Sequence, residues 1–167
     1  MAQIELRDIA HSYSPNSKKP TYALNPFSMT WSDGSRYAIL GPSGCGKTTM
    51  LNIMSGIVRP SEGTLLFDGK EVTDLSTSER NIAQVFQVPV IYGTMSVEQN
   101  LAFPLVCRGY DKNTINAKVQ EVAEALSLQH LLKKSASRLT ADEKQLISLG
   151  RGLVRDGVGG DEMLLEA

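Results

Sequence analysis

The sequence predicts an α/β domain in which a nucleotide-binding core follows an antiparallel β layer and precedes a helical region. Three observations support this fold class. A short apolar run at 36–40 is followed by a glycine-rich loop and by a helix-like run at 47–55. The dipeptide Asp68-Gly69 separates two strand-like runs, which is typical of a β-hairpin. From position 115 onwards, apolar residues recur at helical spacing.

The composition is that of an ordinary globular protein, and it narrows the function classes. The 167 residues are 41% hydrophobic and 21% charged, with a formal net charge of −1, so one domain is the default expectation. A chain without a basic excess lacks the electrostatic footprint of nucleic-acid-binding proteins. No apolar run approaches the roughly 20 residues that cross a bilayer. We therefore expect a cytoplasmic chain with no nucleic-acid partner and no transmembrane segment of its own.

The region before the glycine-rich loop predicts the antiparallel β layer. A strand pattern begins at Ile4, and residues 22–31 and 35–40 supply further extended segments around a turn at 32–34. Within the last segment, the run from Arg36 to Leu40 is short and mostly apolar, so we expect it to form the strand that leads into the loop.

The loop fits the phosphate-binding pattern G-x-x-x-x-G-K-[ST] without a mismatch. Its glycines allow backbone conformations that turn successive N–H groups toward an anion, and the following helix presents its positive end to the same place. In this pattern Lys47 reaches the β- and γ-phosphates, and the hydroxyl of Thr48 coordinates Mg²⁺. The motif leaves ATPases, GTPases and kinases open. The residues predicted to bind the phosphates are Gly41, Pro42, Ser43, Gly44, Cys45, Gly46, Lys47, Thr48 and Thr49.

Both helices and strands are expected beyond the loop. The helix at 47–55 is bounded by Gly56. Hairpin strands are predicted on either side of Asp68-Gly69, and a buried strand at 81–87. The spacing of apolar residues then becomes helical and predicts one helix from Val97 to Val106 and another around 115–126.

Several runs stand in the order found in one family. "GPSGCGKTT" and then "LNIMSGIVRPSEGTLLFDGKEVTDL" resemble its phosphate loop, first helix and hairpin. "NIAQVFQVPVIYGTMSVEQNLAFPL" resembles its glutamine loop and the entry to its helical subdomain, and "LTADEKQLISLGRGLVRD" stands at the place of its signature. From Ile4 to about Val154, the chain resembles the nucleotide-binding subunit of an ATP-binding cassette (ABC) transporter. It is most similar to bacterial importers of sugars, glycerol and related polyols.

The resemblance implies a fold, a layout and a set of partners. The fold is a P-loop NTPase core with an N-terminal antiparallel β layer and an inserted helical subdomain. The β layer and core occupy 1–87, the helical subdomain 88–138, and the signature helix with an incomplete end 139–167. The implied ligands are ATP and Mg²⁺. The implied partners are a second ABC ATPase subunit and the membrane subunits of a transporter, with this chain peripheral on the inner face of the cell membrane.

The resemblance also assigns roles to two residues outside the loop. Tyr13 matches the aromatic residue that stacks on adenine, although a tyrosine capping an edge strand is the structural alternative. Gln87 matches the glutamine whose oxygen approaches Mg²⁺ and the attacking water, because a neutral amide can both ligate a hard cation and donate a hydrogen bond. Lys47 and Gln87 are therefore the expected catalytic residues.

The signature departs from the family pattern Leu-Ser-Gly-Gly-Gln. Here Leu139 is followed by Thr140, Ala141, Asp142 and Glu143. In the family this motif presents N–H groups and a hydroxyl to the γ-phosphate held by the other subunit. The two carboxylates suit a free helix start, with Thr140 and Glu143 as a capping box, but they repel a triphosphate. We infer one of two unlike subunits with unequal sites.

The C-terminal sequence also departs from the family. A strand ending in Asp-Glu is expected, where the aspartate holds Mg²⁺ and the glutamate polarises water. Here Asp161-Glu162 follows two glycines instead of an apolar run, and Glu166 follows an apolar run without the aspartate. We interpret both as chance matches and expect a cassette whose C-terminal part is missing.

Three functional hypotheses follow. The first is an ATPase subunit that hydrolyses MgATP to energise import of a sugar, glycerol or related polyol. The second is an ATP-binding but catalytically silent subunit, favoured by the acidic signature and the missing general base. The third is another P-loop protein, either a small-molecule kinase or a GTPase, although the Asn-Lys-x-Asp motif that marks a GTPase is absent from the sequence.

Overall fold

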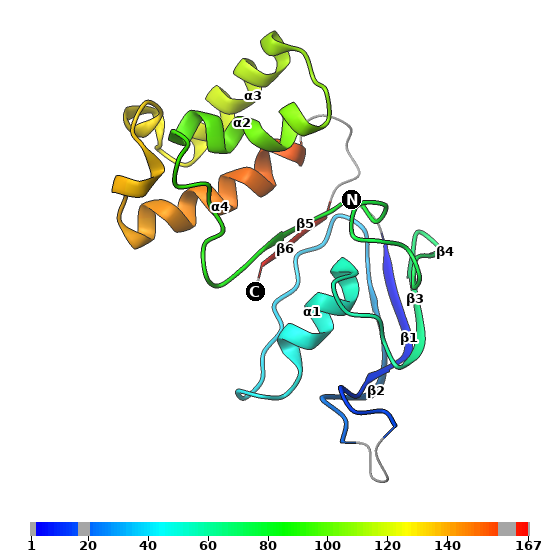
Figure 1. Ribbon diagram of the computed structural model, residues 1–167. Coiled ribbons are helices and arrows are strands. Elements are labelled where there is room, and N and C mark those ends of the chain that lie inside the picture. The colour runs from blue at the N-terminus through cyan, green and yellow to red at the C-terminus, as the bar shows by residue number, and fades with distance from the viewer. Residues whose placement is uncertain (1–2, 17–20, 157–162, 167) are drawn as a thin grey trace. The chain divides into compact units, whose positions relative to one another are not determined.

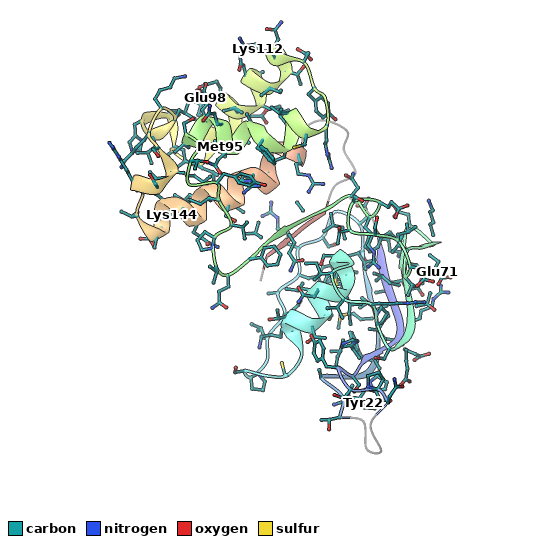
Figure 2. All side chains as sticks on the ribbon, viewed as in Figure 1. Tyr22, Glu71, Met95, Glu98, Lys112 and Lys144 are labelled. Atoms are coloured by element: carbon teal, nitrogen blue, oxygen red, sulfur yellow. The ribbon has the colours of Figure 1, made fainter. Side chains whose placement is uncertain are left out.

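The computed structural model describes residues 3–16, 21–156 and 163–166, and it divides into two units (Figure 1). The first unit covers Met1–Ile82 and the second Ala83–Glu166. Tyr22 and Glu71 mark the first unit in Figure 2, and Met95, Glu98, Lys112 and Lys144 mark the second.

The first unit contains a four-stranded antiparallel sheet with the strand order β2-β1-β3-β4. Ile4 at the start of β1 is paired with Trp31 of β2 on one side and with Phe67 of β3 on the other. This sheet confirms the predicted antiparallel layer. Its strands are β1 (Ile4–His11), β2 (Leu24–Trp31), β3 (Glu62–Phe67) and β4 (Lys70–Glu71).

The hairpin between β3 and β4 turns at Asp68 and Gly69, as predicted. Both residues have a positive φ, of 48° and 74°, which is the conformation that a two-residue type I′ turn requires. The carboxylate of Asp68 also accepts a hydrogen bond from the backbone N–H of Gln3 at 2.8 Å. The turn is therefore fixed to the first strand.

The helix α1 (Lys47–Ser55) begins and ends where the sequence indicates. Its C-terminal cap is Gly56, whose φ of 82° lies in the left-handed region that glycine adopts readily. Ile53 and Met54 are fully buried, as are Leu6 and Leu65 of the sheet. Burial of these apolar side chains supplies the main stabilisation of the unit.

The predicted strand from Arg36 to Leu40 is wrong. Residues 35–40 have no strand conformation, and no strand of the described residues pairs with them. A short apolar run becomes a strand only when a neighbouring strand satisfies its backbone groups. Leu40, at the end of this run, is 91% exposed. Tyr37 is instead stacked on Trp31, with ring centroids 5.3 Å apart.

The second unit is mainly helical. Its helices α2 and α3 confirm the predicted helices, and α4 begins at the signature. Strand β5 confirms the strand expected at 81–87, in a shorter form, and pairs with β6. The elements are β5 (Ile82–Val85), α2 (Val97–Cys107), α3 (Lys112–Ala125), the short 3₁₀ helices η1 (Gln129–Leu131) and η2 (Ala136–Arg138), α4 (Ala141–Asp156) and β6 (Met163–Glu166).

The helices of this unit share one core. Leu101, Leu105, Val119 and Ile147 are almost fully buried within it. Gly150 allows α2 and α4 to approach closely, since a Cβ there would lie only 2.6 Å from a methyl carbon of Leu101. No helix in the described parts of the chain is long and apolar enough to cross a membrane.

Candidate functional site

The phosphate loop keeps the backbone geometry that its glycines predict. Gly44 has a φ of 80°, and Gly46, the N-cap of α1, has a φ of 95°. A Cβ at Gly46 would lie 2.6 Å from the backbone oxygen of Ala23. Glycine at position 46 is therefore required both by its conformation and by the close approach of the chain before β2.

The N-terminus of α1 is left open for an anion. No side chain caps it, and its first turn contains no acidic residue. The other three α-helices are capped by side chains: Ser96 accepts from Gln99 at α2, Asp111 accepts from the first turn of α3, and Thr140 caps α4. Because the first N–H groups of a helix need partners, the uncapped end of α1 suits a phosphate group.

Lys47 lies inside the loop. Its Nζ donates hydrogen bonds to the backbone oxygens of Gly41 at 2.8 Å and Pro42 at 2.9 Å, and it lies 3.7 Å from Sγ of Cys45. The cation is thus placed at the uncapped helix end, where the helix dipole is also positive. Two positive elements at one place suit a polyanion.

The remaining loop residues differ in exposure. Pro42, Ser43 and Cys45 are exposed, as is Thr48. Thr49 is buried. The exposed hydroxyl of Thr48 is available to a ligand, while Thr49 faces the protein.

Tyr13 lies beside this loop, two residues after β1. Tyr13 is 63% exposed, and its hydroxyl lies 3.3 Å from Oγ1 of Thr49. His11 meets the Tyr13 ring edge-on, with centroids 4.5 Å apart and planes at 85°. An open cavity of about 670 Å³ adjoins the ring, with Arg59 and Ser61 also in its lining. The ring therefore contacts His11, while much of Tyr13 stays exposed.

Gln87 and the signature belong to the second unit. Gln87 is exposed and follows β5 by two residues. The residue before it, Phe86, accepts a hydrogen bond through its backbone oxygen from Nε2 of Gln145 in α4 at 3.4 Å. The first unit thus brings Tyr13 and the phosphate loop together, whereas Gln87 lies in the unit that carries the signature.

The signature forms the predicted capping box. The N–H of Thr140 donates to the Glu143 carboxylate at 2.7 Å, and the N–H of Glu143 donates to the Thr140 hydroxyl at 3.2 Å. The hydrogen bond from Thr140 holds the pKa of Glu143 below its usual value, and Lys134, with an Nζ–Oε1 distance of 3.8 Å, acts in the same direction. Leu139 is buried, and Ala141 and Asp142 are exposed. Both polar groups of the box are engaged within the chain itself.

The structure does not test the predictions for the acidic residues near the C-terminus. Asp161 and Glu162 lie outside the described residues. Glu166 lies in β6, which pairs with β5, but its side chain is outside the described part. Their interpretation as chance matches stays a prediction.

Two residues near the site were not predicted from the sequence. His11 supports the Tyr13 ring, and Arg80 contacts the far end of α1. A single histidine at the end of a strand gives no pattern. The acceptors of Arg80 come from two separate segments, so no local spacing reveals them.

Comparisons with known proteins agree with this geometry. A family model described as "ABC transporter" matches residues 24–157. The sn-glycerol-3-phosphate import ATP-binding protein UgpC of Jannaschia sp. (strain CCS1) is 40% identical over 156 residues, which are 93% of this chain and 44% of the relative. The protein of the same name from Escherichia coli (strain K12) is 36% identical over 93% of this chain and 43% of its own length. The chain thus spans less than half the length of the relatives it matches.

Solved structures show the same fold. The ADP conformation of an ATP-binding cassette of an ABC transporter superposes with a TM-score of 0.76 at 22% identity, covering 99% of this chain and 81% of the other. The cbiO1 protein from Clostridium perfringens, part of an ABC transporter complex, gives a TM-score of 0.80 at 24% identity, covering 98% of this chain and 77% of the other. The fold is that of an ABC ATPase cassette, and the chain belongs to the ABC transporter family.

Proposed function

We propose that this chain is the ATP-binding subunit of an ABC importer, and that it binds MgATP at the phosphate loop to energise transport. The observation that carries the proposal is the uncapped N-terminus of α1 with the ammonium group of Lys47 beside it. The names of the relatives support sn-glycerol 3-phosphate, or a related polyol or sugar derivative, as the imported compound. Such a subunit works at the cytoplasmic face of the membrane, bound to the transporter's membrane subunits.

Each loop residue has a distinct role in this proposal. Lys47 exchanges the carbonyl oxygens of Gly41 and Pro42 for the β- and γ-phosphate oxygens, which attract its charge more strongly. The N–H groups at the start of α1 complete the cradle. Tyr13 stacks on the base, and its edge-on contact with His11 fixes the ring beforehand.

The loop also fits a magnesium ion. The hydroxyl of Thr48 is exposed at the second position of α1, next to the phosphate-binding N–H groups, and a hydroxyl oxygen is a suitable ligand for a hard cation. Mg²⁺, when bound, neutralises charge on the β- and γ-phosphates. The role of Gln87 toward Mg²⁺ stays a prediction, and the residue is exposed in the chain after β5.

A specific observation favours a second candidate function, in which the chain binds ATP but is catalytically silent. The carboxylate of Glu143 is held at the start of α4 by the N–H of Thr140, and a glutamate is ionised at neutral pH. A negative charge at this point repels a γ-phosphate brought by another subunit. Such a chain works with an unlike subunit, as one half of a heterodimer with two unequal sites.

Nucleotide competition and turnover separate the candidates. A fluorescent ATP analogue is bound to the chain and displaced with ATP or GTP, and phosphate release is followed in the same sample. An ATPase subunit shows ATP-selective displacement with turnover, and a silent subunit shows the same displacement without it. Equal displacement by GTP contradicts an ATP-selective site and therefore the proposal.

A further inference from the structure

Arg80 is buried at the far end of the phosphate-binding helix. It is only 6% exposed, yet it carries a full positive charge. Nη1 donates to the backbone oxygens of Ile53 at 2.5 Å and Met54 at 3.1 Å. Nη2 donates to that of Thr73 at 2.7 Å, and Nε to that of Leu75 at 3.0 Å. One planar guanidinium therefore joins α1 to the segment at 73–75.

The position of Arg80 complements the helix. Ile53 and Met54 belong to the last turn of α1, where the dipole is negative, and the N–H of Gly56 also donates to the carbonyl oxygen of Ile53 at 3.1 Å. The helix has no basic residue of its own in that turn. Gly56 leaves space for the arginine, since a Cβ there would lie 2.9 Å from Nε of Arg80. Arg80 thus supplies the cation that the C-terminal end of α1 lacks.

The charged guanidinium of Arg80 contacts four backbone carbonyl groups. Burial lowers the pKa of its guanidinium, and the carboxylate of Asp74 opposes that shift. Asp74 itself forms an exposed ion pair with Arg59 at 2.8 Å. An arginine stays protonated even when buried, so the four carbonyl contacts must compensate for its lost hydration. A neutral or smaller side chain would remove these four hydrogen bonds to carbonyl oxygens.

We propose that Arg80 is a positioning residue for phosphate binding, which holds α1 by its C-terminal end so that Lys47 and the N-terminal N–H groups stay aimed at the ligand. The helix has nine residues, a length of about 13 Å, so a shift at one end moves the other. Arg80 also precedes β5 and Gln87 in the chain. The same contact therefore fixes the start of the segment that leads to the glutamine. This proposal rests on the proposed function.

Two variants separate charge from geometry. Arg80→Lys keeps the charge but loses the planar fork that reaches several carbonyls at once. Arg80→Met removes both. The matched control is Arg7→Gln, which removes an exposed arginine of the same unit that is paired with Glu5 at 2.7 Å. Circular dichroism and the urea unfolding midpoint report whether each variant is folded.

The first readout needs no nucleotide. Cys45 in the phosphate loop and Cys107 in the second unit are both exposed, so their labelling rates by a thiol reagent can be compared in one sample by mass spectrometry. We expect both Arg80 variants to change the rate at Cys45 and to leave that at Cys107 unaltered. Arg7→Gln changes neither. A lower unfolding midpoint with an unchanged Cys45 rate would mean that Arg80 only stabilises the fold, and would overturn the proposal.

The second readout is the dissociation constant for MgATP, with adenosine as the comparison ligand. We expect Arg80→Lys to weaken MgATP binding about tenfold and to leave adenosine competition unchanged, because only the phosphate contacts move. If Arg80→Met does not fold, Arg80→Lys decides. A folded Arg80→Lys chain with the original affinity and Cys45 rate contradicts the positioning role. If the unaltered chain binds no ATP, the proposed function fails, and the Cys45 rates still test Arg80.

Discussion

The hydroxyl of Tyr13 lies 3.3 Å from Oγ1 of Thr49, and this contact joins the residue proposed to stack on the base to the helix proposed to bind the phosphates. Tyr13 follows the first strand, and Thr49 lies in the first turn of α1. The two parts of the proposed site are thus in contact within one unit of the chain. Substitutions of these residues can therefore separate their contributions to nucleotide affinity.

Tyr13 should bind the nucleotide through its ring, with little contribution from its hydroxyl. We expect Tyr13→Ala to weaken MgATP binding by about 1–3 kcal/mol, the cost of a lost base–aromatic stack. Tyr13→Phe keeps the ring and loses only the contact with Thr49, so its affinity should stay close to that of the unaltered chain. Isothermal titration of both variants checks this. A Phe variant as weak as the Ala variant would show that Tyr13 acts through its hydroxyl.

Gly46 should be much less tolerant of substitution than Gly44. An alanine at either position has a strained positive φ, at a cost of about 1–2 kcal/mol. At Gly46 the new Cβ would also lie 2.6 Å from the backbone oxygen of Ala23, whereas at Gly44 nothing lies within 4 Å. Urea denaturation should therefore show a larger loss of stability for Gly46→Ala. Equal losses would mean that the backbone before β2 moves away freely.

Cys45 should be shielded by the nucleotide. The thiol is exposed in the phosphate loop, with the Lys47 ammonium 3.7 Å from its sulfur. We expect MgATP to slow the alkylation of Cys45 and to leave Cys107, in the other unit, as the internal reference. Mass spectrometry distinguishes the two peptides. Equal labelling of Cys45 with and without MgATP would count against a nucleotide in this loop.

Glu143 should make the stability of the signature helix depend on pH. Its folded-state pKa is lowered, chiefly by the hydrogen bond from Thr140. A group with a lowered pKa contributes stability that is present above its unfolded pKa and is lost as the pH falls through its folded pKa. The chain should therefore lose stability on acidification below the ordinary range of a glutamate. Unfolding midpoints measured across this range give the slope.

The matched variants for this prediction are Glu143→Gln and Asp142→Asn. The first removes the titrating carboxylate from the capping box, so its midpoint should change less steeply with pH than that of the unaltered chain. Asp142 is an exposed carboxylate in the same turn, and Asp142→Asn should keep most of the slope. If the two variants behave alike, the effect comes from the general charge of the helix start and not from the box.

The parts of the fold that depend on neighbouring residues in the chain were predictable from the sequence. The start of α1 at Lys47 and the capping box of Thr140 with Glu143 are set by residues within one helical turn. The hairpin turn at Asp68-Gly69 is equally local. In each case the residues that define the structure are close in sequence to the backbone that they cap or turn.

The features that depend on distant segments were not predictable in the same way. The run from Arg36 to Leu40 has the composition of a strand, but no strand of the described residues satisfies its backbone. Arg80 draws its four acceptors from α1 and from the segment at 73–75. Only the folded chain brings these groups together, so composition and spacing do not reveal either outcome.

The central claim is that the phosphate loop binds MgATP, and equilibrium binding of a fluorescent ATP analogue to the chain and to its Lys47→Ala variant tests it most directly. We predict saturable binding that unlabelled MgATP displaces, and a loss of about 1.5–3 kcal/mol in the variant, or tenfold or more in affinity, because a charge on the β- and γ-phosphates is removed. A folded chain that binds no analogue, or that binds it equally well after Lys47→Ala, would contradict the account.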